Sequence, residues 1–216
     1  MPAMEAWAVV VAGGGGSRFG RPKQFEQLAG RTLVDRSLDV AREACSGVVL
    51  VLPAERVSDP GEWDVDALVA GGPTRSASVR AGIDAVPGSA SVIAVHDAAR
   101  PLARVELWKA VIDAVAEGAD AAIPAAAVTD TVKEVGEDGH LVTLDRSRLV
   151  AVQTPQAFRA DILRLVHGRG GEATDDAALV EEAGGRVQLV PGPRDNIKIT
   201  CPEDLLVASA LLEGLR

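Results

Sequence analysis

Cysteine is scarce in this chain of 216 residues, which contains only Cys45 and Cys201 and no CxxC pair. The three histidines, His96, His140 and His167, are too widely spaced to form a local cluster of metal ligands. Structural zinc sites and disulfide frameworks need closely spaced ligands or several cysteine pairs. The sequence therefore favours neither, and we expect no metal centre built from protein side chains alone.

Long hydrophobic runs are also missing. No apolar run approaches the roughly 20 residues that a helix needs to span a bilayer. The N-terminus lacks the basic segment and uninterrupted apolar stretch of a secretory signal. We therefore expect no membrane association and a cytoplasmic location. The composition, 47% hydrophobic and 25% charged, is typical of a folded globular protein, and residues 1–216 have a length that suits a single domain.

Positive charge is in deficit, because 31 acidic residues outnumber 22 lysines and arginines and give a formal net charge of -9. Proteins that bind nucleic acid normally present a basic face to the phosphates. Nucleic acid is therefore not an expected partner, and any bound phosphate must be met by local basic groups. Lysine is especially rare, so each of its positions is informative: Lys23, Lys109, Lys133 and Lys198.

Short apolar runs rich in β-branched residues recur along the chain, with helical stretches between them. They occupy residues 7–11, 48–52, 65–69, 92–95 and 121–125. Such runs are typical of strands buried on both faces of a parallel sheet. Between the last two, Val105, Trp108, Ile112 and Val115 form one apolar stripe at helical spacing. The pattern predicts an α/β fold with a mostly parallel sheet flanked by helices, whose ligands bind beyond the carboxyl ends of the strands.

One segment, residues 129–152, breaks this rhythm. Its stretch DTVKEVGEDGHLVTLD alternates apolar and polar positions around the turn signal formed by Asp138 and Gly139. We interpret the segment as a projecting β-hairpin arm. An isolated hairpin is marginally stable and exposes its strand edges, so homodimerisation through the arm is a hypothesis. Further along, residues 202–214 are typical of a final helix.

The stretch VVVAGGGGSRFGRPKQF, residues 9–25, leads an apolar strand into four consecutive glycines followed by Arg18, Arg21 and Lys23. Two familiar phosphate-binding motifs fail on spacing. A P-loop needs Lys and Ser/Thr where Arg21 and Pro22 stand, and a dinucleotide fingerprint finds no glycine at its third glycine position. Backbone N–H groups and basic side chains after a strand can still bind an anion such as a nucleoside triphosphate. A flexible glycine turn with solvated basic residues explains this stretch equally well when it is taken alone.

A second glycine-rich loop, GGPTRSASVRAG at residues 71–82, follows another predicted strand and opens a helix. Thr74 is a candidate N-cap, with Arg75 and Ser78 close by. The loop is therefore either a site that binds an anion at a helix N-terminus or an ordinary capped helix start.

A third loop, VHDAARP at residues 95–101, ends an apolar strand with Asp97 and Arg100. The Asp97 carboxylate could bind a metal or a sugar hydroxyl, or cap a helix. His96 could act as a base, but a histidine between a strand and an aspartate is more often structural, with its hydrogen bonds satisfied. We therefore leave His96 out of the predicted catalytic groups.

Three further polar stretches say less individually. QTPQAF carries Thr154 and DNIKIT carries Lys198, each at a predicted loop or strand end. The pair Asp175 and Asp176 could bind a cation or act as acid and base. Helix capping is the favoured interpretation of this pair, because Thr174 or Asp175 directly precedes an apolar helix.

Taken together and in order, seven stretches resemble the 2-C-methyl-D-erythritol 4-phosphate cytidylyltransferase family of the non-mevalonate isoprenoid pathway. They are AGGGGSRFGRPKQF, GGPTRSASV, VHDAARP, DTVK, QTPQAF, TDDAALVEEAG and DNIKIT, and the resemblance covers essentially the whole chain. The resemblance implies a glycosyltransferase-A-like nucleotide-binding fold and a homodimer joined through the arm. It also implies transfer of CMP from CTP to a sugar-alcohol phosphate with release of pyrophosphate. A divalent cation, normally Mg²⁺, would be held mainly by the CTP phosphates, with Asp97 as the one candidate protein contact.

The resemblance further implies roles for individual residues. The catalytic set, which stabilises the transition state or positions the acceptor, is Arg18, Lys23, Arg146 and Lys198. The CTP-binding set is Ala12, Gly13, Gly14, Gly15, Gly16, Ser17, Gly71, Gly72 and Ser78. The acceptor-binding set is Asp97, Arg100, Thr131, Arg146, Thr154 and Lys198. Some of these contacts cross the dimer interface in the family, which would explain why the arm carries Thr131 and leads into Arg146.

Two other functions agree with parts of the sequence. A ribitol 5-phosphate cytidylyltransferase has similar nucleotide loops and a different acceptor, but VHDAARP together with QTPQAF favours methylerythritol phosphate. A catalytically silent nucleotide-binding module would keep the fold, but the intact basic set of Arg18, Lys23, Arg146 and Lys198 argues against it.

The expected reaction needs no general base, because a phosphate monoester is already largely ionised near neutral pH, and positioning with charge stabilisation suffices.

Overall fold

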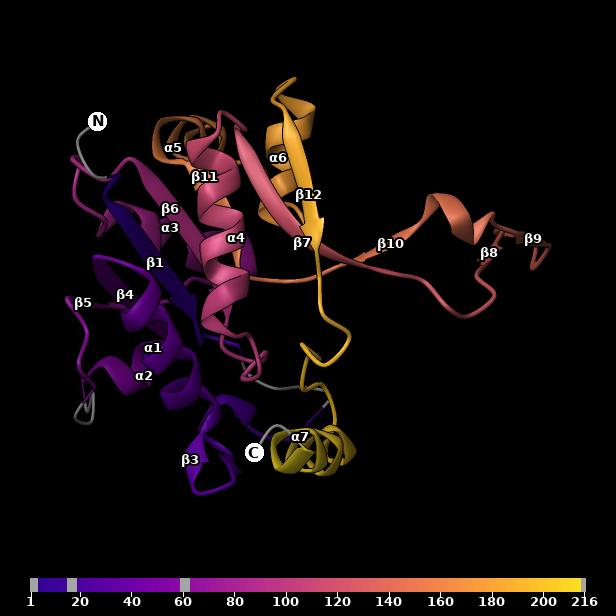
Figure 1. The fold of residues 1–216 in the computed structure, drawn as a ribbon, viewed down its shortest axis with the longest axis horizontal. Coiled ribbons are helices and arrows are strands. Elements are labelled where there is room, and N and C mark those ends of the chain that lie inside the picture. Colours follow the sequence, from indigo (N-terminus) through magenta and orange to yellow (C-terminus); the bar gives the residue numbers. More distant parts are fainter. Residues whose placement is uncertain (1–3, 15–18, 59–62, 215–216) are drawn as a thin grey trace.

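The computed structural model describes residues 4–14, 19–58 and 63–214. A single large sheet crosses the body of the molecule, helices cover both of its faces, and a long arm projects from one side (Figure 1). None of the helices in these ranges is long and apolar enough to cross a membrane.

Four of the predicted apolar runs form the parallel part of the sheet. They are β1 (Ala6–Val11), β4 (Gly47–Leu52), β5 (Ala67–Ala70) and β6 (Val92–Asp97), in the spatial order β6-β1-β4-β5. Every residue of β4 and β6 is buried, as expected for strands covered on both faces. The prediction of a strand over 65–69 was wrong at its start. The ladder begins at Ala67. Just before it, the Asp66 amide donates to the Val48 carbonyl at 2.9 Å, and the Val48 amide donates at 2.7 Å to the Asp66 carboxylate instead of to a backbone carbonyl.

The other half of the sheet is mixed in direction. It contains β7 (Ala121–Ala127), β10 (Val150–Val152), β11 (Gln156–Arg159) and β12 (Val187–Pro191). β7 pairs in parallel with β12 and antiparallel with β10 and β11, and β11 also pairs antiparallel with β6. The order is therefore β10-β7-β11-β6-β1-β4-β5, with β12 beside β7. The apolar pattern predicted β7 but none of its three partners in this half.

The two faces of the sheet are covered by different helices. On one face lie α1 (Leu33–Ala44) and α4 (Val105–Ala116), and on the other α3 (Arg75–Asp84), α5 (Ala160–Gly168) and α6 (Asp176–Glu182). Alternate residues of one strand serve the two cores: Val10 packs on the first face and Val9 on the second. The predicted α/β architecture and the predicted helix over 105–115 are both confirmed.

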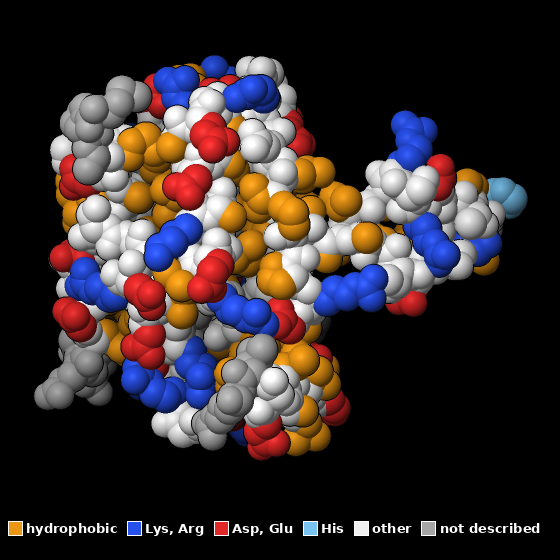
Figure 2. All heavy atoms as spheres, viewed as in Figure 1, with side chains coloured by type: hydrophobic (Ala, Val, Ile, Leu, Met, Phe, Trp, Pro, Cys, Tyr) orange, Lys and Arg blue, Asp and Glu red, His pale blue; other side chains and the backbone are white. Residues whose placement is uncertain are grey.

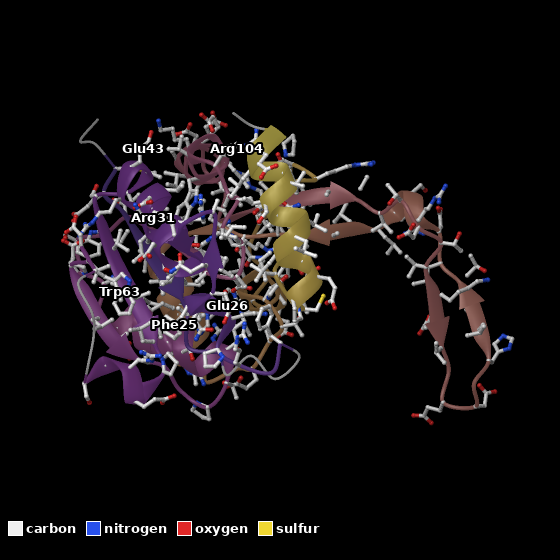
Figure 3. All side chains as sticks on the ribbon, turned by 90° about the horizontal axis from the view of Figure 1, so that it is seen from below. Phe25, Glu26, Arg31, Glu43, Trp63 and Arg104 are labelled. Atoms are coloured by element: carbon white, nitrogen blue, oxygen red, sulfur yellow. The ribbon has the colours of Figure 1, made fainter. Side chains whose placement is uncertain are left out.

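A third apolar cluster lies at the end of the molecule beyond the carboxyl ends of the parallel strands. Leu28 of β2 (Gln27–Leu28) and Ala208 of α7 (Pro202–Gly214) belong to this cluster. The other short elements are η1 (Lys23–Phe25), β3 (Arg31–Thr32) and α2 (Ala54–Val57), and Phe25 and Val57 pack against the core of the first face. Figure 3 looks onto this end, where the rings of Phe25 and Trp63 stack with their centroids 6.3 Å apart. The Trp63 indole also donates to Asp35 at 3.0 Å. These contacts anchor the segment that carries Lys23.

The arm is built as predicted around a tight turn. Its hairpin consists of β8 (Lys133–Val135) and β9 (Leu141–Thr143), and Gly139 has a φ of 80°, the left-handed conformation that glycine adopts without strain. The chain returns through η2 (Arg146–Arg148) to β10, so the end of the predicted arm belongs to the main sheet. The hairpin pairs with no other described strand. It stands clear of the body in Figure 1 and in the space-filling view of Figure 2.

Candidate active site

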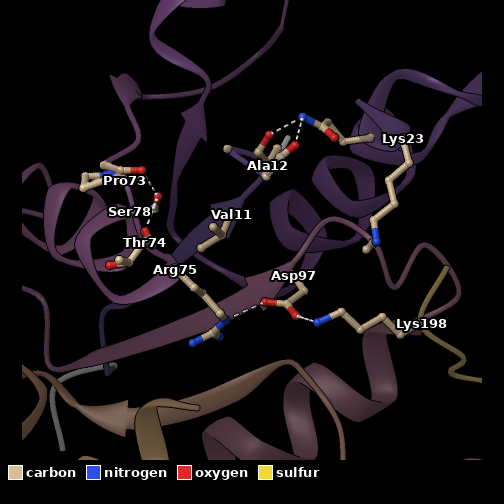
Figure 4. A pocket seen from close by; sticks show the side chains of 14 residues that line it. Val11, Ala12, Lys23, Pro73, Thr74, Arg75, Ser78, Asp97 and Lys198 are labelled. Carbon is tan, nitrogen blue, oxygen red and sulfur yellow. Dashed lines mark hydrogen bonds and ion pairs between the residues drawn. The ribbon is translucent and has the colours of Figure 1, made fainter. Parts of the chain in front are cut away.

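A cavity of about 290 Å³ opens where β1 and β6 end (Figure 4). The predicted site residues that line it are Ala12, Gly13, Gly14, Lys23, Gly72, Ser78, Asp97 and Lys198. These residues come from four separate parts of the chain. The sheet brings them together because the parallel strands place their carboxyl ends at one edge.

The first wall of the cavity is the start of the glycine loop. Gln24, which was not among the predicted site residues, is buried, and its side-chain amide donates to the carbonyl oxygens of Ala12 at 2.7 Å and Gly14 at 3.1 Å. The backbone of the loop is therefore held in place by the residue that follows Lys23. The predicted residues Gly15, Gly16, Ser17 and Arg18 lie outside the described residues.

The second wall is the loop that opens α3. Thr74 is the N-cap, as predicted, and its side chain accepts from the Ala77 amide at 3.0 Å. The loop must approach this helix closely: a Cβ atom at Gly72 would stand 2.5 Å from that of Ala77, and one at Gly71 would stand 2.9 Å from the Ser78 hydroxyl oxygen. Glycine at position 72 therefore lets the loop pack closely on α3, and a side chain at position 71 would displace the Ser78 hydroxyl.

The floor of the cavity is a line of charged groups centred on Asp97. Its Oδ1 accepts from Arg75 Nε at 3.1 Å, and its Oδ2 accepts from Lys198 Nζ at 2.6 Å (Figure 4). Burial alone would raise the pKa of Asp97, but the positive charges of Arg75 and Lys198 hold that pKa well below its ordinary value. Burial would likewise lower the pKa of Arg75, and the carboxylates of Asp97 and Asp176 raise it instead. Asp97 and Arg75 therefore both stay ionised throughout the neutral range.

A metal ion held by protein groups alone does not suit this cavity. The described residues contain no group of three or more His, Cys, Asp or Glu side chains that could hold a metal. A single carboxylate, Asp97, is present, and Mg²⁺ is commonly bound through one or two carboxylates together with substrate phosphates. The residues therefore fit a Mg²⁺ ion that arrives with a nucleotide.

A second cavity of about 370 Å³ adjoins the first through Lys198, which lines both. Arg100 lines this second cavity, and its guanidinium donates to the carbonyl oxygens of Asn196 at 2.8 Å and Val152 at 3.2 Å. Burial lowers the pKa of Arg100 from its ordinary value. Lys198 therefore connects the cavity lined by the predicted CTP-binding residues with the cavity lined by Arg100.

Thr154 lies behind the floor rather than in the cavity. It is buried, and its hydroxyl accepts from the Asp97 amide at 3.1 Å and contacts His96 Nδ1 at 3.1 Å. His96 is also fully buried, which agrees with a structural role. The expectation that its hydrogen bonds are satisfied was wrong for one nitrogen, because Nε2 has no partner among the described residues. The His96 ring packs against the Trp108 ring, with the centroids 5.0 Å apart.

Thr131 and Arg146 are the predicted site residues that the fold does not bring to the cavities. Both lie exposed on the arm, and the Arg146 guanidinium donates to the Thr129 carbonyl at 2.5 Å. Neither lines either of the two cavities in the described part of the chain. Within one chain the predicted acceptor site is thus divided between body and arm.

Three residues that support the site were not in the predicted catalytic or binding sets: Gln24, Arg75 and Asp176. Arg75 stood in a quoted loop, but nothing in the sequence indicated which carboxylates it would meet. Asp176 is not a helix cap; its neighbour Asp175 is, accepting from the Ala178 amide at 2.9 Å. Asp176 instead points inward to Arg75. The available signal in TDDAALVEEAG was an acidic residue at a position where helical spacing predicts a buried apolar side chain.

A glycine-walled cavity with several converging cationic groups, at the carboxyl edge of a mostly parallel sheet, is the arrangement of an α/β nucleotide-binding protein. Comparison with known proteins makes this class specific. The model of the family described as 2-C-methyl-D-erythritol 4-phosphate cytidylyltransferase matches residues 6–214. The chain therefore belongs to this family of nucleotidyltransferases, as its seven motifs predicted.

Individual relatives agree with the family assignment. A 2-C-methyl-D-erythritol 4-phosphate cytidylyltransferase of Rubrobacter xylanophilus is 46% identical, over 96% of this chain and 94% of the relative. Another from Rhodococcus jostii is 44% identical, over 95% and 94%. The crystal structure of 4-diphosphocytidyl-2C-methyl-D-erythritol synthase from Anaerococcus prevotii matches with a TM-score of 0.85 and 28% identity, covering 97% of this chain and 99% of that one. The cytidylyltransferase of Thermus thermophilus matches with a TM-score of 0.79 and 34% identity, covering 95% and 98%.

Proposed function

We propose that this chain transfers CMP from CTP to 2-C-methyl-D-erythritol 4-phosphate and releases pyrophosphate, at the cavity between β1 and β6. The observation that carries the proposal is the set of groups around this one cavity. Glycine-rich backbone forms two walls, Lys23 and Lys198 enter from opposite ends of the chain, and Asp97 lies in the floor. Such a cavity suits a substrate with several phosphates and a second anionic substrate beside it.

The proposed chemical step is an in-line displacement. An oxygen of the acceptor phosphate forms a bond to the α-phosphorus of CTP, and the bond from that phosphorus to the bridging oxygen breaks, so the electron pair leaves with pyrophosphate. No proton transfer is needed, because the attacking phosphate oxygen is already ionised near neutral pH. The obstacle is repulsion: two unit charges about 4 Å apart interact by about 4 kcal/mol at an effective dielectric constant near 20.

The basic residues divide this electrostatic work. Lys23, with Arg18 from the undescribed part of the glycine loop, would stabilise charge at the α-phosphate. Lys198, between the two cavities, would hold the acceptor phosphate. Mg²⁺ would be held by the CTP phosphates with Asp97 as its protein contact, and it would supply further neutralisation of the phosphate charge. Arg100 would contact the acceptor from the second cavity.

Recognition of cytosine would come from the two glycine walls. The close approach of Gly71 and Gly72 to α3 and the pinned backbone at Ala12 to Gly14 leave a narrow space. A narrow wall of backbone groups can reject a larger purine. ATP and GTP are therefore expected to be poor substrates.

The arm would complete the site of a second copy. Thr131 and Arg146 lie away from the cavities of their own chain, and the arm exposes Val135, Leu141 and Val142. A two-stranded hairpin with exposed apolar side chains needs a partner surface. In a two-fold dimer each arm would reach the other subunit's body and deliver both side chains to its acceptor cavity.

The cytoplasmic location expected from the sequence stays a prediction.

One assay tests this function. Purified protein is incubated with CTP, Mg²⁺ and either methylerythritol phosphate or ribitol 5-phosphate, and pyrophosphate release is followed. Release with methylerythritol phosphate alone is the expected result. Release with ribitol 5-phosphate alone would transfer the function to the related enzyme, and no release with either acceptor would favour a silent nucleotide-binding module. The same assay with ATP or GTP in place of CTP tests the nucleotide preference.

A further inference from the structure

Behind the floor of the cavity, Asp176 and His167 form a buried polar pair. The Asp176 side chain is 1% exposed and the His167 side chain 2% exposed. One carboxylate oxygen of Asp176, Oδ1, lies 3.0 Å from His167 Nε2, and the other, Oδ2, accepts from Arg75 Nη1 at 2.9 Å. An ionised carboxylate only accepts hydrogen bonds, so His167 donates from Nε2. Both carboxylate oxygens of Asp176 are thus hydrogen-bonded to specific side chains.

Fold stability alone gives little reason for a charge at this position. Removing a carboxylate from water costs several kcal/mol even when it is paired, and well-packed apolar residues commonly replace buried ion pairs without loss of stability. α6 is already capped by Asp175, so Asp176 is not needed to start the helix. The charge of Asp176 therefore has to be explained by what Arg75 does.

Arg75 connects the pair to the floor of the cavity. Its guanidinium donates from Nη1 to Asp176 and from Nε to Asp97 Oδ1, which leaves Asp97 Oδ2 for Lys198. A guanidinium is planar and rigid, so fixing one edge fixes the direction of the other. If Arg75 were free to turn away, both Asp97 oxygens would be available to the Lys198 ammonium and would draw it away from an acceptor phosphate.

We propose that Asp176 and His167 are positioning residues that act through Arg75 on the Asp97 and Lys198 pair. The proposal rests on the proposed function, because it assigns Lys198 to the acceptor phosphate. Its specific consequence is a split between the substrates. Weakening the buried pair lowers kcat/KM for the acceptor and leaves the KM for CTP nearly unchanged.

The first test is Asp176→Asn, with Asp175→Asn as the matched control. Asparagine keeps the shape, accepts from Arg75 and can donate to His167 in the other tautomer, so the variant removes mainly the charge. We expect kcat/KM for methylerythritol phosphate to fall roughly tenfold, about the effect of 1.4 kcal/mol, with KM for CTP within about twofold of the wild type. The control makes the same chemical change one residue away, and asparagine caps helices as well as aspartate does. Its constants should match the wild type.

A double-mutant cycle separates positioning from a general structural effect. In a chain that already carries Arg75→Ala, the change Asp176→Asn should cost no further acceptor kcat/KM, because the link between Asp176 and Asp97 is gone. Should Arg75→Ala fail to fold, the pair His167→Gln and His167→Leu gives the same information. Glutamine can place a donor where Nε2 stands and should keep near-normal constants, whereas leucine should reproduce the acceptor defect.

Three results would overturn the proposal: wild-type constants for Asp176→Asn, an equal rise of KM for both substrates, or full additivity with Arg75→Ala. Equal defects in the two His167 variants would do the same. Loss of the proposed function is recognised separately, because the wild-type protein itself would then form no product with methylerythritol phosphate.

Discussion

Asp97 and Lys198 stand 101 residues apart in the sequence, yet the carboxylate Oδ2 of one lies 2.6 Å from the ammonium Nζ of the other. The Lys198 side chain remains 39% exposed and borders both cavities. A lysine that is held by one carboxylate and still reaches solvent can turn to a second anion. This relationship makes Lys198 the most direct target for a test of the acceptor site.

Replacement of Lys198 by methionine should keep the fold and lose the reaction. Methionine retains the apolar stem and removes the charge, so kcat/KM for the acceptor should fall roughly 100-fold or more, as for the loss of one stabilising donor in an active site. Steady-state pyrophosphate release gives the constants, and thermal unfolding checks the fold. Lys109→Met, on the exposed side of α4, is the matched control and should behave like the wild type. A near-normal Lys198→Met enzyme would remove Lys198 from the site.

Lys23 should matter for turnover rather than for folding. It lines the cavity beside the glycine loop, and we expect Lys23→Ala to lower kcat far more than it lowers the melting temperature. The physical reason is that its charge would act on the α-phosphate, where negative charge must be stabilised during transfer. Single-turnover measurements with saturating CTP would separate the chemical step from nucleotide binding. Near-normal turnover in Lys23→Ala would refute the assigned role.

Gln24 should control nucleotide binding through the backbone. Gln24→Glu would place carboxylate oxygens against the carbonyl oxygens of Ala12 and Gly14, where the wild type has a donor, and the loop would be pushed out of place. We expect KM for CTP to rise roughly tenfold or more, because one lost buried hydrogen bond and the resulting repulsion exceed about 1.4 kcal/mol. Gln27→Glu, an exposed position in β2, makes the same change as a control. An unchanged KM for CTP would show that Gln24 does not determine the loop geometry.

Mixing two inactive variants tests whether the arm serves a second subunit. Arg146→Ala removes the arm's contribution and Lys198→Ala removes the body's. If each site combines the body of one chain with the arm of the other, a mixed dimer contains one intact site. Random reassembly should then recover about a quarter of the wild-type activity. If each site lies within one chain, the mixture stays as inactive as its parts, and an ultracentrifugation experiment on the wild type shows whether a dimer exists.

The stability of the protein should fall as the solution is acidified from pH 6.5 to about 4. Burial lowers the pKa of His96 from 6.5 to about 4; Asp97 opposes this shift, and Arg100 and Lys198 add to it. The unfolded chain therefore takes up a proton on this histidine at a pH where the folded chain does not, and acid favours unfolding. The full shift corresponds to about 3 kcal/mol.

Urea unfolding at pH 7 and pH 5 measures this loss. His96→Asn keeps a side-chain group near the position of Nδ1, which contacts Thr154, and cannot titrate. Its unfolding free energy should change less between the two pH values than that of the wild type. An identical pH dependence in both proteins would assign the acid sensitivity to other groups.

Several features were determined by the sequence itself. The apolar runs that form β1, β4, β6 and β7 are the pattern of strands buried on both faces of a sheet. The apolar stripe at 105–115 is the pattern of a helix with one buried face. Thr74 as an N-cap and the turn at Gly139 are local effects, settled by residues within a few positions. The seven motifs likewise indicated the family without any structure.

Other features were decided only by the tertiary structure. β11 enters antiparallel between β6 and β7, and its four residues show no periodicity that would indicate this. Arg75 meets Asp97 and Asp176 because α3 and α6 begin where β6 ends, across separations of 22 and 101 residues. Pairings between distant residues depend on the register of the whole sheet, and a local pattern carries no information about that register. For the same reason the sequence could name Thr131 and Arg146 but could not tell that one chain keeps them away from its own cavity.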